Sequence, residues 1–248
     1  MYEESVTPQI QVYPTKEEAA KAAALKIIAA VRENPTATIS YATGDTYVPV
    51  YALIAREIAQ KTVDFSHTTA FHIDEYFPCD PGVSYGFVRY IRENVIEPFH
   101  ISPERAFYIN ATVPDGKVEA AKYELLLTLH PVDLTVLGIG PGGHIGFNEP
   151  GSSFTGKTQF ITLAAGTRYR DHVMRKLNTP DQAITQGIGT ILRSKKIVQT
   201  AFGEEKGTYL KKALQEQISE NCPSSALRLV GSKVTIIIDQ AAGSALQR

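Results

Sequence analysis

Short apolar runs alternate along the chain with longer segments in which apolar residues recur every three or four positions. The apolar runs predict β-strands, and the periodic segments between them predict helices. Strands are expected at residues 10–13, 37–41, 68–73, 132–137, 196–201 and 234–238. Helices are expected at residues 15–34, 48–60, 84–97, 116–129 and 204–217.

This alternation predicts an α/β fold, with a mostly parallel sheet wrapped by helices on both faces in three layers. The run at residues 132–137 is largely apolar, which is typical of a strand covered on both sides. Thr15 and Glu18 have the spacing of a capping box and predict the start of the first helix. We expect one Rossmann-like domain over residues 1–248, since no repeat or linker interrupts the pattern.

Composition narrows the classes of function. The net charge is −1, so no global positive field favours nucleic acid or an anionic membrane, and neither partner is expected. Cys79 and Cys222 are too few and too far apart for a disulfide framework or a zinc site. The first residues, MYEESVTPQI, lack the pattern of a secretory signal. We expect a cytoplasmic protein; a homo-oligomer is compatible with the sequence, which leaves the oligomeric state open.

Polar and glycine-rich loops follow four of the predicted strands. In an open parallel sheet, ligands bind outside the carboxyl ends of the strands. These ends lie at one edge of the sheet, so the four loops are expected to face a common site. The loops are residues 42–46, 74–76, 138–144 and 202–206.

The first of these loops has the features of a phosphate site. Thr43 and Thr46 supply hydroxyls, and Gly44 lets the backbone approach a ligand at the start of a helix. Asp45 complicates this interpretation because a carboxylate repels phosphate. An ordinary capped turn remains the alternative, since threonine and aspartate are both good helix caps.

Asp74 and Glu75 follow the third predicted strand. Adjacent residues of an extended chain point to opposite sides, so we expect one of the two carboxylates to enter the site. A half-buried carboxylate there can have a raised pKa and act as a base. A helix cap or a surface salt bridge is the alternative for this pair.

The segment at residues 138–150, GIGPGGHIGFNEP, carries the densest chemistry of the chain. Its glycines predict a tight loop that a ligand approaches closely. The dinucleotide-binding pattern does not fit, because Gly143 is followed by His144 and no long helix. His144 suits proton transfer near neutral pH, and Glu149 could orient it. No group of residues has the spacing of metal ligands, so no metal is expected.

Three segments resemble the signature sequences of the glucosamine-6-phosphate deaminase/isomerase family. They are ATGDT at residues 42–46, FHIDEYFP at residues 71–78 and LGIGPGGHIGFNEPGSSF at residues 137–154. The resemblance spans about residues 10–239. It implies that an amino-sugar 6-phosphate and water become a ketose 6-phosphate and ammonia, without a cofactor.

The resemblance also implies roles for individual residues. Asp74 would move a proton between C2 and C1 of the open-chain sugar. His144 would help to open the sugar ring, with Glu149 as its supporting carboxylate. The residues expected to contact the sugar phosphate are Thr43, Gly44, Asp45, Thr46, Glu75, Gly138, Gly140, Gly142, Gly143 and Lys206.

Several positions depart from the family pattern. Gly142 stands where the family usually has an acidic residue that assists ring opening, and Asp45 stands where it has glycine. A phosphate-binding arginine has no clean counterpart, although Arg168, Arg170 or Arg175 could substitute. The basic residues that build an allosteric site in some members of the family are replaced by Gln159 and Ile161, so no such activator site is expected.

These departures leave alternatives open. The substrate could be a galactosamine 6-phosphate or another hexose phosphate instead of glucosamine 6-phosphate. The related 6-phosphogluconolactonases share the Gly-x-Gly-Pro-x-Gly-His start of the glycine loop, so lactone hydrolysis with His144 activating water is a second hypothesis. A non-catalytic sugar-phosphate-binding protein is the third.

Overall fold

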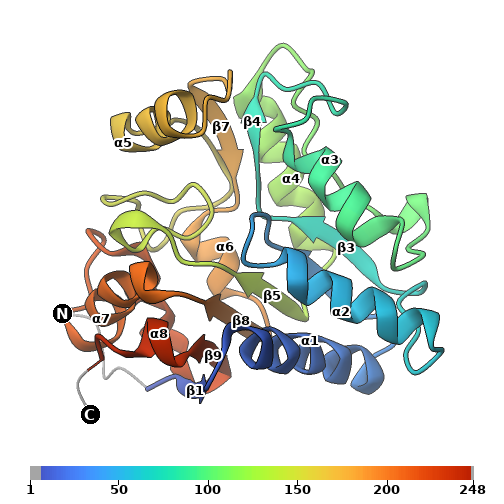
Figure 1. The fold of residues 1–248 in the computed structure, drawn as a ribbon. Helices are drawn as coiled ribbons and strands as arrows, with labels where there is room; N and C mark the ends of the chain where they lie inside the picture. The colour runs from blue at the N-terminus through green and yellow to red at the C-terminus, as the bar shows by residue number, and fades with distance from the viewer. Residues whose placement is uncertain (1–6, 247–248) are drawn as a thin grey trace.

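The larger of two β-sheets dominates the computed structural model, which describes residues 7–246 (Figure 1). Its six strands are all parallel and lie in the order β1-β9-β8-β5-β2-β3. Each strand matches one predicted from the sequence, which confirms the α/β fold class. The strands are β1 (Gln9–Tyr13), β2 (Thr38–Tyr41), β3 (Thr69–His72), β5 (Leu134–Leu137), β8 (Lys196–Ala201) and β9 (Val234–Asp239).

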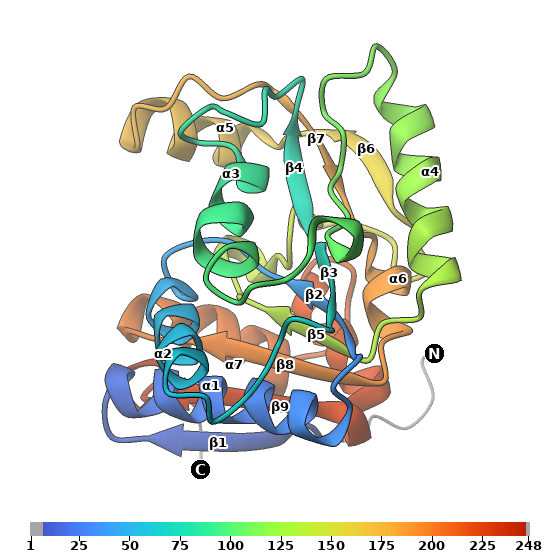
Figure 2. The same ribbon diagram turned by 90° about the vertical axis from the view of Figure 1, so that its right-hand side faces the viewer.

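Helices cover both faces of this sheet (Figures 1 and 2). On one face, α1 (Lys16–Glu33) and α2 (Val48–Ala59) pack against each other, and α1 also contacts β8 and β9. The other face carries α6 (Ile188–Leu192), α7 (Gly207–Gln215) and a 3₁₀ segment (Pro223–Lys233). This division follows from right-handed crossovers between parallel strands. The short helix α8 (Gln240–Gly243) follows β9.

A second, antiparallel sheet was not predicted. Its strands β4 (Asp74–Phe77), β6 (Gln159–Thr162) and β7 (Gln182–Thr185) lie in the order β4-β7-β6, and α4 (Gly116–Leu129) packs on β6 and β7 (Figure 2). In sequence, β4 is hidden because only Ile73 separates it from β3. The chain passes from one sheet to the other at this residue.

Two further helices belong to connections between strands. α3 (Phe87–Ile91) continues into a π-helical turn (Arg92–Ile96), within the helix predicted at residues 84–97. α5 (Ala165–Tyr169) likewise continues into a π-helical turn (Arg170–Met174) and has no counterpart in the predicted elements. Short 3₁₀ turns occupy Pro103–Arg105, Pro141–Gly143 and Glu204–Lys206.

The buried apolar residues form two clusters. The larger lies between the parallel sheet and its helices and includes Ile39, Val136 and Ile236. The smaller surrounds the antiparallel sheet and includes Phe71 and Ile184. Within residues 7–246, no helix combines the length and apolar character needed to cross a membrane.

Candidate active site

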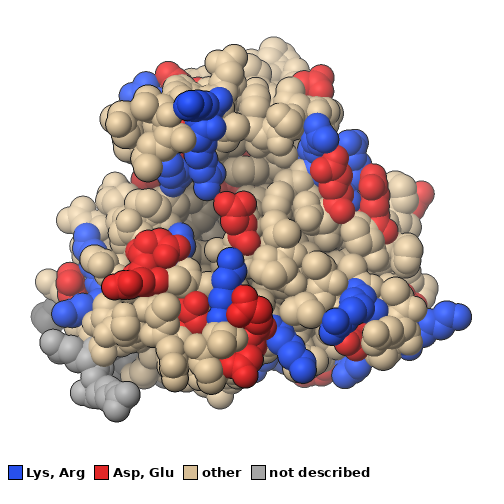
Figure 3. Space-filling view, in the orientation of Figure 1, with Lys and Arg blue, Asp and Glu red and all other residues tan. Residues whose placement is uncertain are grey.

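A cavity of about 450 Å³ opens at the carboxyl ends of the parallel strands, next to the antiparallel sheet. The loops after β2, β5 and β8 line it, together with Ile73 and Asp74 at the end of β3. Four loops predicted to face one site therefore do so. The surface is hollowed there, with basic and acidic side chains gathered around the opening (Figure 3).

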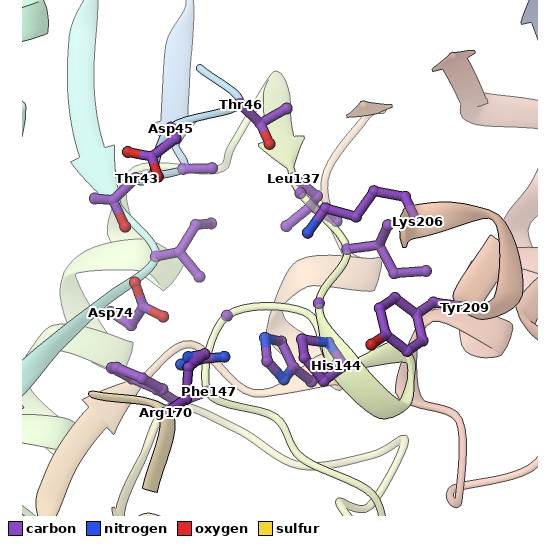
Figure 4. Close-up of a pocket in the computed structure, with 18 of the residues that line it drawn as sticks. Thr43, Asp45, Thr46, Asp74, Leu137, His144, Phe147, Arg170, Lys206 and Tyr209 are labelled. Atoms are coloured by element: carbon purple, nitrogen blue, oxygen red, sulfur yellow. The ribbon is translucent and has the colours of Figure 1, made fainter. Parts of the chain in front are cut away.

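The loop at residues 42–46 forms one side of the cavity, opposite His144 and Arg170 (Figure 4). Gly44 adopts a φ of +97°, a left-handed conformation that favours glycine. Its carbonyl accepts a hydrogen bond from the Tyr90 hydroxyl at 2.9 Å, which fixes the loop against α3. Asp45 is exposed and lines the cavity with Thr43 and Thr46, so it does not turn away from the ligand space.

Asp74 lies on another side of the cavity, as the first residue of β4 (Figure 4). Only 5% of this residue is exposed, and burial raises the pKa of its carboxyl to about 8, with Glu75 adding to the rise and Arg170 opposing it. His72 holds the backbone here: Ile109 N–H donates to Nε2 at 3.0 Å, so Nδ1 donates to the Asp74 carbonyl at 2.9 Å. Burial lowers the pKa of His72 to about 4, so this ring is neutral.

Glu75 points the other way, as strand alternation predicts. Its buried carboxylate accepts backbone N–H groups of Tyr76, Phe87 and Val88 at 2.9, 3.0 and 2.6 Å. It therefore caps the first turn of α3 and does not line the cavity. The structure does not bring Glu75 to the ligand space where the sequence predicted a substrate contact.

The glycines of the loop at residues 138–143 fall into two groups: some line the cavity, and others lie where packing leaves no room for a side chain. Gly138 and Gly140 line the cavity. Gly142 and Gly143, with φ of +70° and +78°, do not line it. A Cβ at Gly142 would meet Pro150 at 2.8 Å, and one at Gly143 would meet the Cys222 sulfur at 2.4 Å. These two predicted substrate contacts are instead turn positions without room for a side chain.

His144 faces the cavity from the same loop (Figure 4). Burial, with smaller contributions from Arg170 and Lys206, lowers the pKa of its ring to about 4. The ring is therefore neutral at pH 7, with one nitrogen able to donate a proton and the other able to accept one. It packs directly on Gly140, where an added Cβ would lie 1.9 Å from Nε2.

Glu149 does not contact His144 among the described residues. Its carboxylate accepts the backbone N–H of Ala164 at 2.6 Å and the hydroxyl of Thr167. It lies outside the residues that line the cavity. The pairing of His144 with Glu149 that the resemblance implied is replaced in this structure by a contact between Glu149 and the start of α5.

Basic side chains converge on the cavity from separate elements. Lys206, Arg170 and Arg175 all line it, as does Lys16 at the start of α1. Burial lowers the pKa of Lys206, and Arg170 and Arg175 lower it further, while Glu205 and Asp45 act against this. Arg170 and Arg175 therefore lie near enough to Lys206 to affect its pKa, and the site favours an anion. Arg168 instead pairs with Asp181 at 3.1 Å, away from the cavity.

An aromatic wall lies beside Asp74, which the sequence interpretation missed. Tyr76, Phe87 and Phe147 line the cavity, with ring centroids 5.0 to 5.7 Å apart. Strand alternation gives a signal for Tyr76, because it lies two residues after Asp74 and so shares its face. Tyr209, also missed, follows Lys206 by three residues, which is one helical turn.

Fold and site together define an α/β protein with a cation-lined cavity that holds a buried carboxyl and a neutral histidine. The chain belongs to the family of glucosamine-6-phosphate isomerases/6-phosphogluconolactonase, whose model matches residues 14–236.

Several relatives are deaminases by name. A glucosamine-6-phosphate deaminase of Bacillus cytotoxicus is 36% identical over 238 residues, covering 94% of this chain and 87% of that protein. One of an Arthrobacter species is 32% identical over 243 residues, covering 96% and 93%. The solved structure of a monomeric glucosamine-6-phosphate deaminase matches with a TM-score of 0.91 and 33% identity, covering 96% of this chain and all of that one. A 6-phosphogluconolactonase from Trypanosoma cruzi has a TM-score of 0.81 at 19% identity over both full chains, a likeness of fold.

Proposed function

We propose that this protein deaminates and isomerises an amino-sugar 6-phosphate, glucosamine 6-phosphate or galactosamine 6-phosphate, to a ketose 6-phosphate and ammonia. One observation carries the proposal: Asp74 presents a buried carboxyl of raised pKa to a cavity that Arg170, Arg175 and Lys206 also line. An acid–base catalyst with a pKa near the working pH suits reversible proton transfer at carbon. The deaminase relatives at 32–36% identity support the same chemistry.

The phosphate group fits the cationic part of the cavity. Backbone N–H groups and hydroxyls at residues 43–46, next to the start of α2, are suited to phosphate oxygens. The Lys206 ammonium adds a point charge suited to phosphate, although burial lowers its pKa. Asp45 lies in the same loop, and its negative charge opposes the fall in the pKa of Lys206 and so favours the ammonium form.

In this proposal, His144 is the group that opens the sugar ring. One nitrogen of a neutral imidazole can accept the proton of the anomeric hydroxyl and then return it to the ring oxygen. The C1–ring oxygen bond then breaks and leaves an aldehyde. Because Gly142 brings no acid and Glu149 is engaged with α5, His144 performs this step without a carboxylate partner among the described residues.

Asp74 then carries the isomerisation. Its carboxylate takes the proton from C2, giving an enolamine, and a proton returns to C1, giving an imine at C2. Water adds to this imine, and ammonia leaves to give the ketose phosphate. The 2-amino group and the carbonyl make the C2 proton acidic enough for a carboxylate, so the reaction needs no cofactor. We expect this enzyme in the cytoplasm, where Cys79 and Cys222, both free, stay reduced.

The test is turnover by the wild-type protein and by Asp74→Asn. Wild type should release equal amounts of ammonia and ketose phosphate from one of the two amino-sugar phosphates. Asp74→Asn should lose about a thousandfold or more of kcat, since general base catalysis contributes roughly 10²–10⁴, while still binding the sugar phosphate. Asp64→Asn is the matched control, because Asp64 precedes β3 at the opposite end and its side chain is 68% exposed.

Two outcomes would contradict the proposal. One is a folded wild-type protein that turns over neither amino-sugar phosphate. The other is Asp74→Asn with wild-type activity, which would remove Asp74 from its role. Hydrolysis of 6-phosphogluconolactone above its spontaneous rate, with no ammonia from either amino sugar, would indicate that the protein is a lactonase and not a deaminase.

A further inference from the structure

Both arginines of the cavity come from one short connection between β6 and β7, which we call the arginine segment (residues 164–177). It contains α5 and the π-helical turn Arg170–Met174. Arg170 lies beside His144 and Phe147 in the cavity (Figure 4). Arg175, just after the turn, lines the same cavity. The position of this segment therefore sets the position of both charges.

The arginine segment has almost no apolar anchor of its own. Within the arginine segment, all of which the structure describes, Thr167 and Asp171 are the only buried residues. The large apolar side chains of α5 and the turn face outward, since Tyr169, Val173 and Met174 are 60%, 54% and 71% exposed. A helix with this pattern is not held by the hydrophobic effect, which needs an apolar face turned inward.

The two buried residues each make a polar contact with another part of the site. The Thr167 hydroxyl donates to Glu149, which also accepts the Ala164 N–H at 2.6 Å. The Asp171 carboxylate accepts the Tyr76 hydroxyl at 3.0 Å and Arg170 Nε at 3.2 Å. Arg175 lies 4.0 Å from the same carboxylate, so Asp171 touches both cavity arginines.

These contacts join the arginine segment to the two elements that carry the proposed chemistry. Glu149 follows His144 by five residues in the glycine loop. Tyr76 follows Asp74 by two residues in β4. One contact thus ties the start of α5 to the histidine loop, and the other ties the middle of the segment to the strand of the base.

We propose that Thr167 and Asp171 are positioning residues, which fix the arginine segment so that Arg170 and Arg175 present their charges to the anionic group of the substrate. This inference rests on the proposed function for the identity of that group, a sugar phosphate. The carboxylate of Asp171 acts through the arginines and through Tyr76, and it does not line the cavity itself. Glu149 acts here as the acceptor that holds α5.

The test separates substrate affinity from turnover. Thr167→Val and Tyr76→Phe each remove one hydroxyl and keep the volume of the side chain, so folding should be preserved. Each should raise KM for the amino-sugar phosphate about three- to tenfold, the worth of one hydrogen bond, with kcat within about twofold. Asp171→Asn, which removes the charge between the arginines, should raise KM further. Thr167→Ser keeps the donor and should restore the wild-type KM.

Asp181→Asn is the matched control. It breaks the ion pair with Arg168 on the same segment, at 3.1 Å, but touches neither buried contact nor the cavity. It should leave KM and kcat unchanged. An effect as large as that of Tyr76→Phe would mean that any weakening of the segment suffices, and would overturn the specific roles of Thr167 and Asp171.

Binding of inorganic phosphate, measured by calorimetry, keeps this test independent of turnover. Its Kd should rise in Thr167→Val and Tyr76→Phe by the same factor as KM. If wild type binds phosphate but deaminates neither amino sugar, the proposed function fails while the phosphate series still tests the positioning. Folded variants with unchanged KM and unchanged phosphate Kd, or with a lowered kcat alone, would overturn the inference.

Discussion

The two sides of the cavity are held in place by different forces. On one side, the loops after β2, β5 and β8 extend directly from strands whose residues are almost all buried in the larger core. On the other, the arginine segment is attached through buried polar contacts of Thr167 and Asp171. The loops after β2, β5 and β8 are thus anchored by the buried sheet. The arginine segment instead depends on a few hydrogen bonds, each of which contributes only modestly to stability.

This difference separates two demands on the site. In the proposed reaction, Asp74 and His144 must hold reacting atoms closely, and the buried strands β3 and β5 that precede them supply that precision. The arginines act through charge, which falls off slowly with distance, so their support can be weaker. Changes that displace Asp74 or His144 should therefore affect turnover, and changes in the arginine segment should affect affinity.

The largest effect in this comparison should come from crowding His144. Gly140→Ala adds a methyl carbon that would lie only 1.9 Å from Nε2 of His144. The ring must move, and a displacement of about 1 Å at a reacting group costs on the order of a hundredfold in rate. We expect that loss in kcat, measured as ammonia release at saturating amino-sugar phosphate.

Gly138→Ala is the matched comparison for this change. It lies in the same loop and lines the same cavity, but an added Cβ there meets no atom within 4 Å. Its effect on kcat should be much smaller than that of Gly140→Ala. Equal losses in the two variants would show that the loop backbone, and not the position of His144, limits turnover.

A smaller effect should follow from removing the charge of Lys206. Lys206→Gln should raise KM for the sugar phosphate about tenfold, the lower range for a charge-assisted hydrogen bond, because Arg170 and Arg175 remain. Initial rates over a range of substrate concentrations would measure it. Lys211→Gln, in α7 but outside the cavity lining, is the control and should match wild type. A wild-type KM in Lys206→Gln would exclude this lysine from phosphate binding.

The smallest and most local difference should appear in hydrogen exchange of the free protein. Amides of α5 and the π-helical turn should exchange at least about tenfold faster than those of β5 and β8, because few buried contacts oppose local opening of the arginine segment. Mass spectrometry of peptic fragments would resolve the two regions. Equal protection would contradict the contrast between the two sides of the cavity.

The same contrast explains which parts of the fold and of the site could be predicted from the sequence. Apolar runs such as residues 234–238 specify the parallel sheet, and the topology of parallel strands brings their loops together. Asp74, His144 and Lys206 were therefore predicted to share a site, and all three line one cavity. Their placement needed only local patterns and one general rule of topology.

The rest depended on contacts between distant residues. Glu149 is five residues from His144 in sequence, yet its carboxylate is turned to Ala164 and Thr167. The four-residue strands β6 and β7 carry too few positions for a clear period, and β4 reads as a continuation of β3. Choosing Arg170 and Arg175 over Arg168 required the Asp171 and Asp181 contacts, which no local pattern encodes.

The central claim is that Asp74 is a buried carboxyl whose pKa lies near the working pH. Carbon-13 NMR of protein labelled at the aspartate carboxyl carbons tests it directly, with Asp74→Asn identifying the resonance by its loss. Because burial disfavours the ionised form, Asp74 should stay protonated well above pH 4 and titrate with a midpoint of about 8. A midpoint near 4, the ordinary value for aspartate, would contradict the account.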